Sequence, residues 1–115
     1  MKLLYKNNKV KTLCTNEKKA IKELGLDIAN KLFKAIYVLE SALNLKDILS
    51  LPQYNLHVLR GDKNGIYSMY LGKNTGYRLL LIPLDVDDNP VISVDMSIYM
   101  LTVCVEIIEV SKHYE

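Results

Sequence analysis

The sequence predicts an α+β protein in which an N-terminal strand and two helices pack on a twisted antiparallel sheet. Apolar residues recur at helical spacing between about residue 17 and residue 43, and the spacing becomes alternating after Pro52. Short turns that contain glycine separate the first alternating segments, which is typical of an antiparallel meander with helices on one face. Because the chain has 115 residues, we expect a single domain over residues 1–115.

The first part of the chain predicts one short strand and two helices. Leu3 to Tyr5 is an apolar run between lysines, and the two asparagines after it indicate a turn. Thr15 or Asn16 is the candidate N-cap of a helix that we expect to end at Gly25. Asp27 is the candidate N-cap of a second helix, whose apolar residues recur at steps of three and four, so that one face packs on the core. This stripe consists of Ile28, Leu32, Ile36, Leu39 and Leu43.

Four further strands are predicted after Pro52. Each is short and rich in Val, Ile, Leu and Tyr, and the loops between the first three have the length of hairpin connections. The connection from Pro83 to Met100 is long for a hairpin, and the sequence leaves open whether it is a mobile excursion or partly structured around residues 91–94. The expected strands are residues 56–59, 66–71, 77–82 and 103–110, with hairpin loops at residues 61–65 and 72–76.

The net charge of +2 conceals an uneven distribution along the chain. Residues 1–34 carry nine lysines against three acids, whereas residues 85–115 carry one lysine against seven acids. A basic first third is compatible with binding along a nucleic-acid backbone or to an acidic partner, and equally with lysines on solvated faces of a strand and helices.

The sequence carries few signs of a membrane, a cofactor or a metal. No apolar run approaches the roughly 20 residues of a membrane-spanning helix, and the N-terminal apolar stretch is too short for a signal peptide, so we expect a cytoplasmic protein. Cys14 and Cys104 are far apart and lack C-x-x-C spacing, which favours two reduced thiols. Nucleotide-binding, hydrolase and zincin motifs are absent, so we expect no metal and no small-molecule cofactor.

Polar residues suited to acid–base and phosphate chemistry lie at the ends of the predicted strands. Arg78 interrupts an apolar strand, where a half-buried guanidinium requires an anionic partner, either a carboxylate such as Asp62 or a phosphate. Histidine exchanges protons near neutral pH, and an adjacent cation stabilises a phosphorane. Histidines and arginines at neighbouring strand ends are therefore suited to RNA cleavage without a metal. The candidate catalytic residues are His57, Arg60, Arg78, His113 and Tyr114, and the candidate RNA-binding residues are Lys63, Lys73 and Lys112.

A shared site for His57 and Arg60 requires an irregular strand. Strict alternation places their side chains on opposite faces of the sheet. We therefore expect a turn or bulge at Gly61, which the Gly-Asp pair favours.

Three segments of the chain carry a resemblance to a known family: L-P-Q-Y-N-L-H-V-L-R-G-D-K-N-G-I-Y-S from Leu51, G-Y-R-L-L-L-I-P-L from Gly76 and V-E-I-I-E-V-S-K-H-Y-E from Val105. They resemble the RelE/ParE superfamily of toxin-antitoxin toxins, and most closely its HigB-like branch, the plasmid-maintenance killer proteins. By this resemblance His57 matches the site histidine, Arg60 the basic residue that is Lys in the branch, and Arg78 the strand arginine. The ending departs from the family, because His113 precedes Tyr114 where the branch has Tyr then His, so the residue that faces RNA is open.

The resemblance implies a compact fold like that of microbial RNases and a function in a type II toxin-antitoxin system. The expected activity is that of an mRNA interferase, a metal-independent endoribonuclease that cuts mRNA on the ribosome through attack of the ribose 2′-OH. The implied partner is a helix-turn-helix antitoxin of the HigA type. Two alternatives stay open: a ParE-like toxin that inhibits DNA gyrase without catalysis, and a degenerate toxin that only binds its antitoxin.

Overall fold

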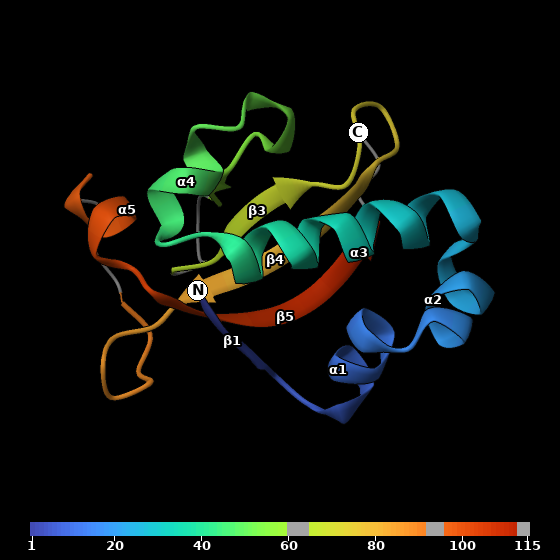
Figure 1. Cartoon of the computed structure of the whole chain (residues 1–115), viewed down its shortest axis with the longest axis horizontal. Helices are drawn as coiled ribbons and strands as arrows, with labels where there is room; N and C mark the ends of the chain where they lie inside the picture. Colours follow the sequence, from blue (N-terminus) through green and yellow to red (C-terminus); the bar gives the residue numbers. More distant parts are fainter. Residues whose placement is uncertain (60–64, 92–95, 113–115) are drawn as a thin grey trace.

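A computed structural model describes residues 1–59, 65–91 and 96–112 of the chain. These residues form an α+β fold, as the sequence predicts, with helices packed on a mixed sheet (Figure 1). The helices are α1 (Asn8–Thr15), α2 (Glu17–Leu24), α3 (Leu26–Ser41), α4 (Leu45–Leu49) and α5 (Ser97–Leu101), with a 3-10 helix at Pro52–Tyr54. The strands are β1 (Lys2–Tyr5), β2 (His57–Val58), β3 (Tyr67–Tyr70), β4 (Tyr77–Pro83) and β5 (Cys104–Lys112).

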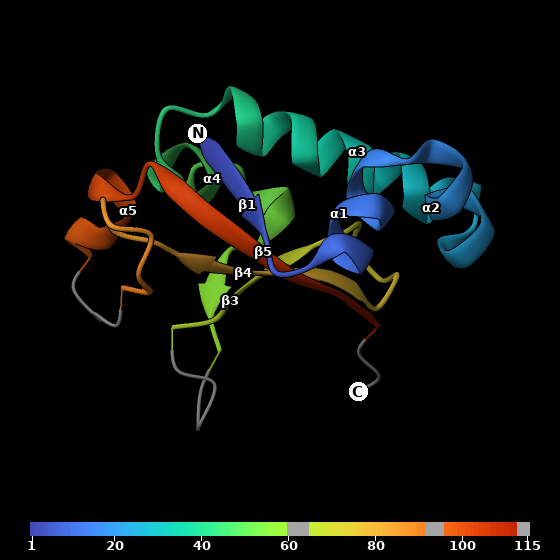
Figure 2. The same cartoon turned by 90° about the horizontal axis from the view of Figure 1, so that it is seen from below.

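The helices and the sheet form two layers. Helices α1 to α4 lie on one side of the sheet, with α3 running across its centre, and α5 lies at one end (Figure 2). No helix of the described residues covers the opposite side, which we call the open face. In the same residues, no helix is both long enough and apolar enough to cross a membrane.

The strand order in the sheet is β1-β5-β4-β3-β2. Strands β2, β3, β4 and β5 pair with their neighbours in antiparallel orientation, as predicted. Strand β1 differs, because it joins β5 in parallel from Lys2 opposite Cys104 to Tyr5 opposite Ile107. This parallel pair makes the sheet mixed. Because β1 and β5 lie at opposite ends of the sequence, no short turn between them requires the antiparallel orientation.

The N-terminal helices show both the strength and the limit of capping signals. Asn16 caps α2 as predicted, its side chain accepting a hydrogen bond from the Lys19 N–H at 3.0 Å, and Gly25 ends that helix at φ 84°. Helix α1 was not predicted. Asn7, interpreted as a turn residue, caps it by accepting from the Val10 N–H at 2.9 Å. An Asn at the start of a turn and an Asn at a helix N-cap look the same in a sequence.

Helix α3 buries one face in the core, together with residues of β3, β4 and β5. Four of the five residues of its predicted stripe are buried, but Leu43 lies beyond the helix and is 81 % exposed. Gly25, not Asp27, occupies the N-cap position of α3. The centre of the core is β4, where Leu79 and Leu81 are fully buried beneath the helices.

The two cysteines are free and buried, as the predicted reduced thiols require. Burial raises the pKa of the Cys14 thiol to about 12. Its thiolate is therefore scarce at neutral pH, and the side chain serves packing rather than chemistry.

The long connection between β4 and β5 is partly structured. Its second half contains α5, and its first half is a turn in which the Asp85 carboxylate accepts hydrogen bonds from the N–H groups of Asp87 and Asn89 at 2.9 and 3.0 Å. The sequence placed any structure of this connection around residues 91–94, and because residues 92–95 lie outside the described residues that expectation stays a prediction.

Candidate functional site

Three polar or aromatic side chains come together on the open face. Arg78 of β4 stands directly opposite Tyr70 of β3, and His57 of β2 stands opposite Ser68, two residues before Tyr70. The residues that alternate with them, Met69 and Leu79, are fully buried in the core. Since successive strand residues point to opposite faces, His57, Tyr70 and Arg78 share the face that the helices leave uncovered.

Tyr70 is the link between the histidine and the arginine. The Arg78 Cζ atom lies over the Tyr70 ring, 5.5 Å from its centroid. The His57 ring meets the same ring edge-on, with centroids 6.3 Å apart and planes at 85°. Cation–π and edge-to-face contacts each contribute on the order of 0.5–1.5 kcal/mol, so a half-buried tyrosine holds both groups in place. We name these three residues the His57–Tyr70–Arg78 cluster.

The backbone before β2 fixes the His57 ring and its tautomer. The 3-10 helix ends at Asn55, which adopts a left-handed conformation with φ 43°. The Asn55 carbonyl oxygen lies 2.7 Å from His57 Nδ1. A carbonyl only accepts hydrogen bonds, so Nδ1 carries the proton and donates it. In the neutral ring the proton acceptor is then Nε2, the nitrogen that a general base requires.

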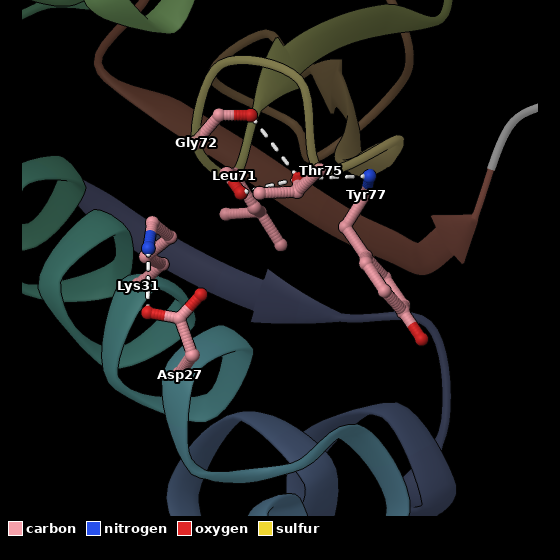
Figure 3. Close-up of polar contacts among 6 residues, drawn as sticks. All are labelled: Asp27, Lys31, Leu71, Gly72, Thr75 and Tyr77. Carbon is pink, nitrogen blue, oxygen red and sulfur yellow. Dashed lines mark hydrogen bonds and ion pairs between the residues drawn. The ribbon is translucent and has the colours of Figure 1, made fainter.

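The β3–β4 turn, which sets the register of Tyr70 and Arg78, is held by one hydroxyl (Figure 3). Thr75 Oγ1 donates to the carbonyl oxygens of Leu71 and Gly72, at 2.8 and 3.1 Å, and accepts from the Tyr77 N–H at 3.1 Å. Gly72 has φ 90°, and a Cβ there would lie 2.6 Å from Lys31 Cε. A side chain at Gly72 would therefore be strained at this φ and would have to displace the flexible end of Lys31.

Thr75→Val tests how much this turn contributes to stability. The substitution keeps the shape of the side chain but leaves the Tyr77 N–H without its acceptor, so we expect a loss of about 1–3 kcal/mol in the free energy of unfolding. Urea denaturation measures that loss, and Thr75→Ser, which keeps the hydroxyl, is the matched control. Equal stability of the Val and Ser variants would show that the hydroxyl does not hold the turn.

The structure separates two of the predicted RNA-binding lysines. Lys73 is exposed in the β3–β4 turn and lines two surface hollows together with Tyr70. Lys112 pairs across the strands with Tyr77, and its Nζ lies 5.4 Å from that ring's centroid. Because Tyr77 packs against the core, Lys112 belongs to the helix-covered side and not to the cluster's face.

Two carboxylates lie farther along the open face. Glu109 of β5 stands opposite Leu80, and Glu106 stands opposite Ile82. Both are farther from the β3–β4 turn than Arg78 is. The open face is therefore basic at the turn end and acidic toward the other end, so a bound phosphate is favoured near Arg78.

Several predicted site residues lie outside the described residues, and their predicted roles stay predictions. A bulge was expected at Gly61, which is one of these residues. The structure does show a register shift elsewhere, in the β4–β5 pairing between Leu80 and Leu81. The predicted residues concerned are Arg60, Lys63, His113 and Tyr114, together with the expected bulge at Gly61 and the alternative partner Asp62.

Sequence reasoning missed Tyr70. It was interpreted as one member of an alternating strand, and its position opposite Arg78 follows only from the strand register. Within residues 1–59, 65–91 and 96–112, no three His, Cys, Asp or Glu side chains are grouped as a metal site requires. Comparison with models of known protein families gives no match, and comparison with curated proteins gives no significant relative.

Proposed function

We propose that this protein is the toxin of a type II toxin-antitoxin system, a ribosome-dependent endonuclease that cuts mRNA without a metal ion. The observation that carries the proposal is the His57–Tyr70–Arg78 cluster, with a proton acceptor and a guanidinium on either side of one aromatic ring. Among the described residues, no helix covers this face of the sheet, which is compatible with access of a polymeric substrate. The segments that resemble RelE/ParE toxins contain His57 and Arg78, and the first of them ends two residues before Tyr70.

The cluster has two of the groups that cleavage through the ribose 2′-OH requires, a base and a phosphate-binding cation. His57 Nε2 takes the proton from the 2′-OH, the 2′-oxygen bonds to the adjacent phosphorus, and the bond to the 5′-oxygen breaks. The Arg78 guanidinium stabilises the charge that builds on the phosphorane. A second acid, for which His113 or Tyr114 is the candidate, gives the 5′-oxygen its proton. The products are a 2′,3′-cyclic phosphate and a 5′-hydroxyl.

Tyr70 supplies a surface for a base. Sequence-specific and single-stranded RNA recognition commonly stacks unpaired bases on aromatic rings, and the ring of Tyr70 lies between the proposed base and the proposed phosphate cation. Under this proposal the protein acts in the cytoplasm, where ribosomes are, and a helix-turn-helix antitoxin encoded beside it neutralises it.

Inducible expression followed by mapping of mRNA 5′ ends tests the proposal. We expect growth arrest, new 5′-hydroxyl ends at a fixed position within codons, and loss of both effects in the double variant His57→Ala/His113→Ala. A folded double variant that still arrests growth would contradict the nuclease proposal. A gyrase supercoiling assay on the same protein then distinguishes a ParE-like inhibitor.

A further inference from the structure

A groove leads away from the cluster around the end of the sheet. A hollow of about 620 Å³ lies between α3, the 3-10 helix and the β3–β4 turn. A second hollow of about 580 Å³ lies beside the same turn and reaches Arg78. Both are lined by Tyr70, Gly72 and Lys73, so the two hollows adjoin along this segment. We call the two hollows together the groove, and it reaches the cluster at Tyr70 and Arg78.

The lining of the groove is basic. Four of its described residues are cations, and none is acidic. Asp27, which does not line the groove, pairs with Lys31 at 2.6 Å, while the stem of Lys31 lies close to Gly72 (Figure 3). Lys34 and Lys73 are exposed and have no ion pair with a described carboxylate. The four cations are Lys31, Lys34, Lys73 and Arg78.

Other lining residues include groups of the kind that contact a single strand of nucleic acid. The groove contains polar amides, Gln53, Asn55 and Asn74, whose side chains donate and accept hydrogen bonds. Tyr70 stands where the groove meets the cluster. A positively charged groove with aromatic surfaces is the arrangement that proteins use to follow the backbone of a single strand.

We infer that this groove binds the phosphates of the single-stranded RNA that flanks the scissile bond, with Lys34 and Lys73 as the contacting cations. The inference rests on the proposed function, because it places the rest of the substrate relative to the cleaved phosphate. Glu106 and Glu109 lie at the other end of the open face and repel a phosphate chain, so they favour an RNA path from Arg78 into the groove over a path along the rest of the open face. The groove passes from the open face to the helix side, so RNA bends around the end of β3.

Salt-dependent binding of the full-length protein to RNA tests this inference separately from cleavage. The probe is a short fluorescein-labelled 2′-O-methyl RNA, which cannot be cleaved through its 2′ position, and the readout is fluorescence anisotropy from low to moderate salt. The test variant is Lys34→Gln/Lys73→Gln. The matched control is Lys18→Gln/Lys22→Gln on α2, which removes the same charge from two exposed lysines outside the groove.

We expect the groove variant to weaken binding roughly tenfold at low salt and to reduce the slope of log affinity against log salt by about 1.4, or about 0.7 for each lost phosphate contact. The control variant should keep the slope of the unmodified protein. Equal losses in both variants, or no binding by the unmodified protein, would overturn the inference. If the groove variant loses binding while cells expressing the unmodified protein show no new mRNA ends, the groove stands and the nuclease proposal fails.

Discussion

His57→Asn should lower the rate of mRNA cleavage by about 10²–10⁴-fold while leaving the fold intact. The Asn side chain places an amide nitrogen near the position of His57 Nδ1, so it can still donate to the Asn55 carbonyl. It has no counterpart of Nε2, the atom that we propose accepts the 2′-OH proton. The substitution therefore removes the proposed base and keeps the contact that positions it. The measurement is single-turnover cleavage of mRNA on programmed ribosomes.

The control for this variant is chemical rescue. His57→Ala leaves a space at the half-buried ring position, and added imidazole should restore part of its cleavage rate if proton transfer is what was lost. Urea denaturation of both variants reports whether they are folded. A folded His57→Asn variant with the full cleavage rate would show that another group is the base.

Leu79→Ala should destabilise the protein by about 2–5 kcal/mol, which is a large part of the roughly 5–15 kcal/mol that a domain of this size has. Leu79 is fully buried at the centre of the sheet, between Met69 on β3 and Val110 on β5. Removing three carbon atoms there leaves a cavity that rigid strands on both sides cannot fill. The change is measured as a shift of the urea midpoint at constant slope.

Leu80→Ala is the matched control, because Leu80 is the next residue on the same strand. It lies on the open face and is only half-buried, so the same truncation should cost about 1 kcal/mol. Equal losses for Leu79→Ala and Leu80→Ala would mean that the open face is packed as closely as the core.

The sequence predicted those helices and hairpins whose ends are marked by a capping residue or a glycine. Asn16 and Gly25 bound α2 because a cap and a left-handed residue act within one helical turn. The β3–β4 hairpin was predicted from two glycines around a short loop, for the same reason. No local signal predicts the parallel pairing of β1 with β5, because that pairing depends on how the whole chain between the two strands packs.

The candidate site shows the same division. The chemistry of His57 and Arg78 was readable from residue type and from a cation in an apolar strand. Their meeting through Tyr70 was not, because it requires the register of three strands. The side of the sheet that Lys112 occupies also depends on register, and sequence alone grouped it with residues on the other face.

The position of β5 bears on when the protein can fold during synthesis. Strand β5 follows every other described strand in the sequence, yet it lies between β1 and β4 in the sheet. While the chain is being translated, β1 has no partner strand until β5 has left the ribosome. Contacts between such distant segments slow folding. The nascent chain therefore completes its sheet only after β5 emerges from the ribosome, and until then the edge of β4 that pairs with β5 is also without its partner.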